Sequence, residues 1–186
     1  MSKTTAAALA GFLALALVTP VAAAAQTSPA DRLLFDRISE QVARYTQYTI
    51  FDSLSASVEN GRVVLTGWVT MAYKRDDLER RVRRVEGVTS VENAVQVLPV
   101  SRFDDELRFR IARAIYGHSS FWQYASMVNP PIHIVVSQGR VTLEGVVASN
   151  VERMLARSLA SGFGALEVTS RLRTDAEVRE VLASGD

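Results

Sequence analysis

Apolar residues in this chain follow first a helical and then a strand period, and the whole succession occurs twice. The first succession consists of Leu34, Ile38, Val42 and Tyr45 followed by Leu54, Ala56 and Val58, and the second of Leu107, Ile111 and Ile115 followed by Ile132, Ile134 and Val136. Residues three or four apart share one face of a helix, whereas alternating residues share one face of a strand. Each succession therefore predicts an amphipathic helix followed by a half-buried strand.

A short motif follows each predicted first strand, and its two copies are nearly the same. Residues 60–69 read NGRVVLTGWV and residues 138–147 read QGRVTLEGVV, which share Gly-Arg-Val-x-Leu-x-Gly-x-Val. Gly61 and Gly139 tolerate the positive φ of a tight turn, so each motif predicts a β-hairpin. Gly67 and Gly145 fall on the apolar face of the second strand, where a side chain is expected to collide with a helix packed across the sheet.

Each hairpin is followed by a second helical pattern and a final strand pattern. The helical positions are Leu78, Val82 and Val85 or Val151, Met154, Leu155, Ser158 and Leu159, and the strand positions are Val91, Val95 and Val97 or Leu166, Val168 and Leu172. Gly87 and Gly162 stand where a helix end favours left-handed backbone. The expected structural glycines are therefore Gly61, Gly67, Gly87, Gly139, Gly145 and Gly162. The expected fold class is α+β, with two tandem small α-β-β-α-β domains that each place two helices on one face of a three-stranded mixed sheet.

The chain between the two units predicts where the domains begin and end. Pro99 and a very short linker separate the units. The expected organisation is a signal peptide at 1–25, a linker at 26–30, domains at 31–100 and 101–175, and a tail at 176–186. The apolar residues Val178, Val181 and Leu182 of the tail would share one face of a short helix, which we expect to fray. Domains this small bury only about 60% of the surface that their unfolded chains expose. We therefore expect the two domains to pack against each other.

The N-terminal segment predicts export from the cell. Lys3 precedes an apolar run from Ala6 to Val18 that contains no acidic residue, and Pro20 and small residues up to Ala25 follow. This run is too short to span a membrane, which needs about 20 apolar residues. The pattern is typical of a signal peptide cleaved near Ala25, so the mature protein is expected in the periplasm or outside the cell.

The composition excludes several classes of function. The chain has 21 Lys and Arg against 20 Asp and Glu, so a formal net charge of +1 gives no strongly basic field for nucleic acid. It contains no cysteine, which removes disulfides, thiol nucleophiles and cysteine metal sites. No HExxH, Walker or dinucleotide motif occurs. We therefore expect no nucleic-acid partner, no cofactor and no metal.

The polar residues that could act in catalysis have simpler structural interpretations. His133 alternates with apolar neighbours and is expected to face outward, and His118 ends a predicted helix, where a cation suits the helix dipole. The acidic residues at 76–77 and at 104–106 open predicted helices, where negative charge is also favourable. These interpretations indicate a protein that is not an enzyme.

The repeated unit resembles the BON domain of bacterial envelope proteins. The resemblance rests on the element order, on the hairpin motif with Gly67-Trp68-Val69, and on the segment VTSVENAV after Gly87. It covers nearly all of the chain after the signal segment as two tandem copies, and the second copy has Val-Thr-Ser at 168–170 in place of the usual Val-x-Asn. The resemblance implies a non-enzymatic envelope module that binds phospholipid or membrane surfaces and is associated with osmotic protection and transport systems.

A cluster of arginines lies on the second predicted helix of the first unit. Its members are Arg80, Arg81, Arg83 and Arg84. Acidic residues one turn upstream, Asp76, Asp77 and Glu79, favour a solvated helix face with ion pairs between successive turns. The alternative is a surface for anionic headgroups, because arginine matches phosphate with two parallel hydrogen bonds.

An aromatic segment without a counterpart in the first unit precedes the first strand of the second unit. The candidate contact residues are Phe121, Trp122, Tyr124 and Met127, together with Arg108, Arg110 and Arg113 on the preceding helix. Tryptophan and tyrosine favour membrane interfaces, since one end of each is apolar and the other stays hydrated. Arginines beside them would attract anionic lipid. The alternative is that these aromatic residues fill the space between the two domains.

Together these observations predict an exported binding protein that associates peripherally with anionic phospholipid or a membrane surface of the envelope. A second hypothesis is a periplasmic chaperone-like or scaffolding protein that binds other envelope proteins under osmotic or envelope stress. Co-sedimentation with liposomes distinguishes the two.

Overall fold

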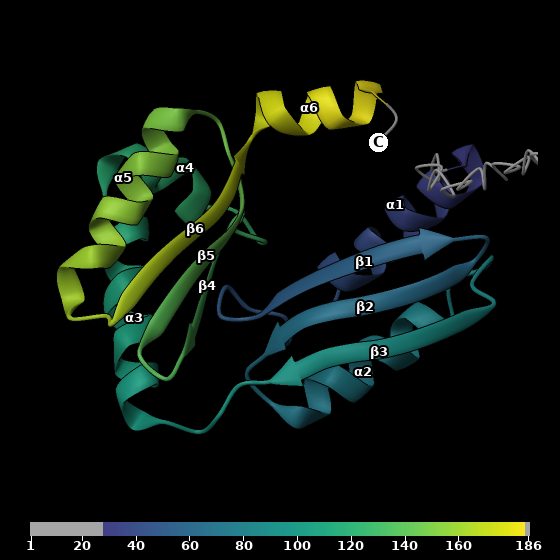
Figure 1. The fold of residues 1–186 in the computed structure, drawn as a ribbon, viewed down its shortest axis with the longest axis horizontal. Coiled ribbons are helices and arrows are strands. Elements are labelled where there is room, and N and C mark those ends of the chain that lie inside the picture. The colour runs from purple at the N-terminus through teal and green to yellow at the C-terminus, as the bar shows by residue number, and fades with distance from the viewer. Residues whose placement is uncertain (1–27, 185–186) are drawn as a thin grey trace, which may run out of the picture.

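The computed structural model describes residues 28–184 and shows two α+β domains joined by a short connection (Figure 1). Domain 1 contains α1 (Pro29–Ala43), β1 (Ser53–Glu59), β2 (Arg62–Val69), α2 (Ala72–Arg83) and β3 (Ser90–Val97). Domain 2 contains α3 (Arg102–Tyr116), η1 (Ser119–Phe121), α4 (Trp122–Ala125), β4 (Ile132–Ser137), β5 (Arg140–Val147), α5 (Asn150–Ala160), η2 (Ser161–Phe163) and β6 (Glu167–Thr174), and α6 (Asp175–Ser184) follows. The predicted fold class is confirmed. The predicted signal peptide lies outside the described residues.

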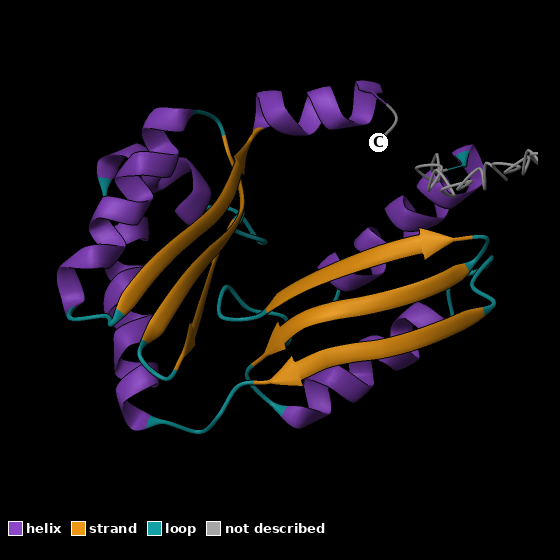
Figure 2. Ribbon diagram, in the orientation of Figure 1, coloured by secondary structure: helices purple, strands orange, loops and turns teal. Residues whose placement is uncertain are grey.

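Each domain is a three-stranded mixed sheet with two main helices on one face (Figure 2). The strand orders are β1-β2-β3 and β4-β5-β6, and in both sheets the first pair is antiparallel and the second parallel. The parallel pairs are possible because α2 and α5 cross over from the second strand to the third. Gly61 and Gly139 have the positive φ predicted from the repeated motif, and the residues before them, Asn60 and Gln138, have positive φ as well.

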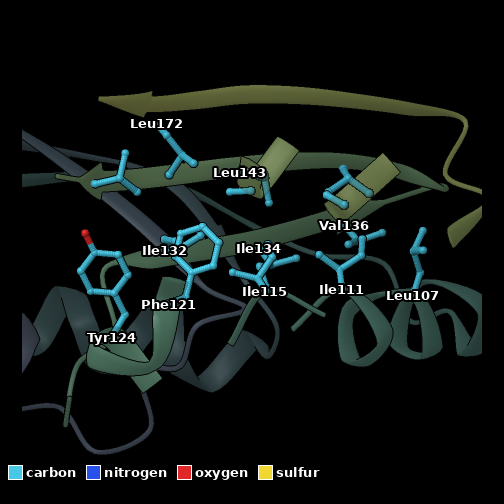
Figure 3. Close-up of a cluster of buried hydrophobic side chains, with 14 residues drawn as sticks. Leu107, Ile111, Ile115, Phe121, Tyr124, Ile132, Ile134, Val136, Leu143 and Leu172 are labelled. Atoms are coloured by element: carbon cyan, nitrogen blue, oxygen red, sulfur yellow. The ribbon is translucent and has the colours of Figure 1, made fainter. Parts of the chain in front are cut away.

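The core of each domain lies between the sheet and the helices. Figure 3 shows Ile111 and Ile115 of α3 pointing at Ile134 of β4, and all three are fully buried. The prediction for α5 is wrong in part, because Val151 and Met154 are 68% and 65% exposed. The buried face of α5 consists instead of small residues, Ala156 and Ala160, together with the partly buried Leu155 and Leu159. Small side chains at the contact allow the helix to approach its neighbours closely.

Gly67 and Gly145 are required by the backbone, although not for the predicted reason. Their φ values are +122° and +119°, a region that residues with a side chain rarely adopt. A Cβ on Gly67 would lie 2.2 Å from the Ser53 carbonyl oxygen, and one on Gly145 would lie 1.8 Å from that of Pro131. The collision is therefore with the backbone at the start of the neighbouring strand, and not with a helix.

The helix ends differ from the sequence prediction in two places. Gly87 has the expected positive φ, but Gly162 does not. Because η2 continues the helical path after α5, the left-handed residue comes later, at Gly164. The acidic residues at 76–77 also do not open α2, because that helix begins at Ala72 and places them in its second turn.

An aspartate ties the first helix of each domain to the hairpin turn. In domain 2 the Asp104 carboxylate accepts hydrogen bonds from the Gln138 and Gly139 N–H groups, each at 2.8 Å. In domain 1 the Asp31 carboxylate accepts one from the Gly61 N–H at 3.2 Å. Both aspartates are buried, and such donors offset the cost of burying a carboxylate. The predicted helix-opening role of residues 104–106 is confirmed for α3.

The C-terminal segment forms a helix, α6, over the apolar positions at which the sequence allows a short helix. Glu177, in the first turn of α6, accepts a hydrogen bond from the Thr174 N–H at 2.8 Å and forms an ion pair with Arg153 at 2.9 Å. At the other end, α1 begins at Pro29, within the segment predicted as a linker. Within residues 28–184, no helix has the length and apolar character needed to cross a membrane.

Candidate functional site

The aromatic segment between α3 and β4 contains both buried and exposed side chains. Phe121 is fully buried and Tyr124 is 7% exposed, and both belong to the core of domain 2 (Figure 3). Trp122 and Met127, in contrast, are 67% and 47% exposed. The expectation that Phe121 and Tyr124 contact a membrane or fill the space between the domains is therefore wrong, because domain 2 uses them to complete its own core. The indole of Trp122 remains available for an external contact.

Tyr124 also partners polar groups at the start of α5. Its hydroxyl donates to the Glu152 carboxylate at 2.7 Å and accepts from the Ala148 N–H at 3.0 Å. Burial raises the pKa of Tyr124, and the bond to Glu152 adds to the shift, so the hydroxyl stays protonated. At the corresponding place in domain 1, the Asp52 carboxylate accepts from Lys74 at 2.7 Å. The aromatic segment thus supplies in domain 2 a polar contact that an ion pair supplies in domain 1.

Exposed apolar side chains occur both in this segment and on α5. Val151 and Met154 are exposed on α5, and the hydrogen bond between Tyr124 and Glu152 connects α4 to the beginning of that helix. We name Trp122, Met127, Val151 and Met154 the helical patch. Single exposed apolar residues are common on proteins, but two in the aromatic segment and two on α5 together indicate a contact surface. The sequence pattern did not reveal the two α5 members, because it placed them in the core.

Arg108 is one of the arginines predicted to accompany the aromatic segment, and it is buried. Its guanidinium donates to the Val136 carbonyl at 2.6 Å and forms an ion pair with Asp105. Only 4% of the residue is exposed. The expectation that Arg108 contacts lipid is therefore wrong, because its buried guanidinium donates to a backbone carbonyl at the edge of the domain 2 sheet.

The other two arginines predicted to accompany the aromatic segment are exposed on α3 and differ in their partners. Arg110 forms an ion pair with Glu106 one turn earlier. Arg113, in the last turn, has no carboxylate partner among residues 28–184. The same is true of Arg157, which lies three residues after Met154 on α5 and was not singled out from the sequence. Arg113 and Arg157 are therefore the exposed cations nearest in the chain to the helical patch.

The arginines of α2 contact residues of domain 1. Ion pairs join Arg80 to Asp77 and Arg83 to Glu79. Arg81 lies over the Tyr45 ring, 4.6 Å from its centroid, and the Tyr45 hydroxyl donates to Asp77 at 2.8 Å. Burial and this hydrogen bond raise the pKa of Tyr45 to about 12. These contacts favour the solvated, ion-paired interpretation. In the described part of the chain Arg81 and Arg84 have no ion pair with a carboxylate, and of these two only Arg81 lies over an aromatic ring.

Domain 1 contacts domain 2 through the loop between α1 and β1, which lies between the two sheets in Figure 1. The Ile50 carbonyl accepts a hydrogen bond from the Ile134 N–H of β4 at 2.7 Å. The rings of Phe51 and Phe109 meet edge to face, with centroids 5.1 Å apart. The expected packing between the domains is present, and this loop provides the aromatic contact.

Both histidine side chains make contacts within the protein. The His118 Nδ1 accepts from the Ser120 N–H at 3.2 Å at the start of η1. His133 faces away from the core of its own domain, as predicted, but domain 1 covers it, with the Tyr48 ring centroid 5.3 Å away. Burial lowers the pKa of His133, so the neutral imidazole is favoured there.

A groove of about 920 Å³ lies between the domains. One wall is formed by α1, β1 and the loop that joins them, and the other by the helix-free face of the domain 2 sheet together with residues 128–131 and Val178 of α6. Apolar residues such as Phe35 and Val42 line the first wall, whereas Arg171 and Arg173 line the second. No motif in the sequence indicates this groove, because its walls come from both domains.

Comparisons with known proteins identify the repeated unit. The solved structures similar to this chain include two of CdsD, a structural protein of the type III secretion system of Chlamydia trachomatis. A C-terminal domain of CdsD is 17% identical, with a TM-score of 0.33 over 81% of this chain and 69% of that chain, and the second structure is 15% identical, with a TM-score of 0.28 over 81% and 97%. No curated protein matches the sequence.

The BON domain family matches the chain twice, at residues 33–99 and 104–176. These two segments contain the repeated hairpins, the paired helices and both mixed sheets. The chain therefore belongs to the BON domain family and carries two copies of the domain in tandem.

Proposed function

We propose that this protein is a non-enzymatic, exported module that binds anionic phospholipid at a membrane surface of the envelope through the helical patch. The exposed Trp122 carries the proposal, because two thirds of a large amphipathic side chain stands in solvent. Met127 of the same segment and Val151 and Met154 of α5, the helix to which Tyr124 connects this segment, are exposed as well. Membership of the BON domain family supports a role in the envelope that involves no catalysis.

The chemistry of the patch suits the boundary between headgroups and acyl chains. An indole favours that boundary because its ring is apolar and its N–H can remain hydrated. Val151 and Met154 add apolar surface, and Arg113 and Arg157 supply positive charge. An arginine near an anionic surface contributes about 1 kcal/mol, so binding should be peripheral and sensitive to salt.

The test is co-sedimentation of the protein with vesicles of phosphatidylcholine, with and without phosphatidylglycerol. We expect binding only to the anionic vesicles, and we expect Trp122→Ala to weaken it several-fold without lowering the melting temperature. Phe103→Ala is the matched control, because Phe103 is 56% exposed but lies in the first turn of α3, at the opposite end from the patch. This control should bind vesicles as the parent does.

A second measurement follows the indole directly. In a Trp68→Phe background Trp122 is the remaining tryptophan, and its emission should shift to shorter wavelength when anionic vesicles are added. Failure of the parent to bind anionic vesicles at low salt would refute the proposal. The chaperone-like or scaffolding role would then be the better hypothesis.

A further inference from the structure

The free edge of β1 borders the groove between the domains. In an antiparallel pair, alternate residues direct their backbone groups to the partner strand, and the residues between them direct theirs outward. The pairing with β2 makes Leu54, Ala56 and Val58 the outward residues of β1. The Leu54 N–H donates to the Tyr48 hydroxyl at 3.0 Å. Within residues 28–184 the outward backbone groups of Ala56 and Val58 have no hydrogen-bond partner, and Ala56 lines the groove.

At the corresponding edge of domain 2, each outward residue has one backbone group bonded to another part of the chain. Tyr116 donates to the Ile132 carbonyl, the Ile134 N–H donates to the Ile50 carbonyl, and Arg108 donates to the Val136 carbonyl. Proteins commonly cover or charge their edge strands, because an open edge pairs readily with another chain. The open edge of β1 therefore differs from its counterpart within the same molecule.

Two residues of the first helix account for this difference. Aligning Asp31 with Asp104, which hold the two hairpin turns, places Phe35 opposite Arg108 and Ala43 opposite Tyr116. The side chains of Phe35 and Ala43 contain no hydrogen-bond donor, so they cannot close the edge as Arg108 and Tyr116 do. Phe35 is instead 41% exposed and lines the groove, which adds an apolar contact beside the open strand.

The wall that faces this edge carries positive charge. Arg171 pairs with Glu144 at 3.2 Å, and Glu144 also accepts a hydrogen bond from Ser53. Arg173 lines the same wall, is exposed, and has no carboxylate partner in the described part of the chain. A carboxylate on a ligand would therefore complement Arg173.

We propose that this groove binds an extended segment of another polypeptide, which pairs with β1 as an added strand, packs apolar side chains against Phe35 and places a carboxylate near Arg173. A polypeptide backbone offers donors and acceptors at the spacing of the strand edge, whereas an acyl chain would leave the Ala56 N–H and carbonyl unpaired. The interaction involves different residues from the helical patch, so it goes beyond the proposed lipid binding.

The probe is a fluorescein-labelled synthetic peptide that alternates threonine and valine and ends in two aspartates, and its binding is followed by fluorescence anisotropy. Ala56→Pro removes an outward N–H that the sheet does not use, and proline is tolerated at such edge positions. We expect it to weaken binding of the peptide about tenfold. Phe35→Arg introduces the residue type that closes the edge in domain 2, and it should weaken binding by a similar factor.

Matched controls separate the groove from general effects on α1 and on charge. Leu33 is 54% exposed on α1 and does not line the groove, so Leu33→Arg should leave peptide binding unchanged. Arg173→Glu should weaken binding, whereas Arg157→Glu, which reverses a similar exposed charge on α5, should not. Circular dichroism establishes which variants are folded, and Phe35→Arg decides the question if Ala56→Pro does not fold.

Three results would overturn the inference. The parent could fail to bind the peptide at millimolar concentration, or folded Ala56→Pro and Phe35→Arg could both bind it with the affinity of the parent. The third is that Phe35→Arg lowers binding to anionic vesicles while the peptide is not bound, which would make the groove a lipid site. Trp122→Ala distinguishes failure here from failure of the proposed function, because it should weaken vesicle binding and leave peptide binding intact.

Discussion

Gly145→Ala is expected to destabilise domain 2 strongly, for two separable reasons. The residue has φ +119°, and an alanine in such a conformation costs about 1–3 kcal/mol. The new Cβ would also lie 1.8 Å from the Pro131 carbonyl oxygen, so the backbone beside β4 must move. Forcing an atom into a packed site typically costs about 1–3 kcal/mol more. The total of about 2–6 kcal/mol is a large part of the roughly 5–15 kcal/mol that stabilises a typical domain.

Two other glycines of domain 2 separate these contributions. Gly164 has φ +78° but nothing within 4 Å of the position of a Cβ, so Gly164→Ala should cost only the conformational strain of about 1–2 kcal/mol. Gly162 has neither a positive φ nor a neighbour within 4 Å. Gly162→Ala should therefore be neutral or stabilise by about 0.4–1 kcal/mol, because alanine lowers the entropy of the unfolded chain.

Urea unfolding of the three variants measures this series. Circular dichroism follows the loss of helix and sheet in each variant. The expected order of the free energy of unfolding is Gly162→Ala, then Gly164→Ala, then Gly145→Ala as the least stable. If Gly145→Ala unfolds within about 0.5 kcal/mol of Gly162→Ala, the assigned backbone contact between β5 and Pro131 is wrong.

Two further predictions concern buried charge. Lys74→Met leaves the Asp52 carboxylate buried without its ammonium partner and should destabilise domain 1 by about 3–5 kcal/mol in urea unfolding. Burial alone would raise the pKa of Asp52, but Lys74 and the Thr70 N–H outweigh burial and hold that pKa below its ordinary value. The contribution of Asp52 to stability should therefore persist above about pH 4 and disappear as the pH falls through the lower pKa of the folded protein. Unfolding curves at pH 7 and pH 3 test this. Because burial lowers the pKa of His133, the unfolded chain takes up a proton more readily, and stability should decline as the pH falls below about 6.5. The decline should be smaller in His133→Gln, and equal slopes in the two proteins would contradict the assigned burial.

The order of helices and strands could be read from the sequence because its signals are local. Apolar spacing around Ile38 and Ile111 and the glycines of the two turns specify elements within a few residues of themselves. The repeat then extended the interpretation from one domain to the other. The ends of helices follow less directly from the local sequence. Gly162 is an example, since the continuation of α5 into η2 depends on packing and not on the glycine alone.

The candidate site depended on tertiary structure, because exposure is a property of what packs on a residue. Phe121 and Trp122 are adjacent aromatic residues, yet one is fully buried and the other 67% exposed, since the short helices turn only one of them toward the core. Arg108 reads as a surface cation in the sequence and is buried against the edge of a strand that lies 28 residues later. Pairing of elements and closure of strand edges arise from contacts between distant segments, which form only when a domain folds. The groove between the domains forms only when the two folded domains pack together.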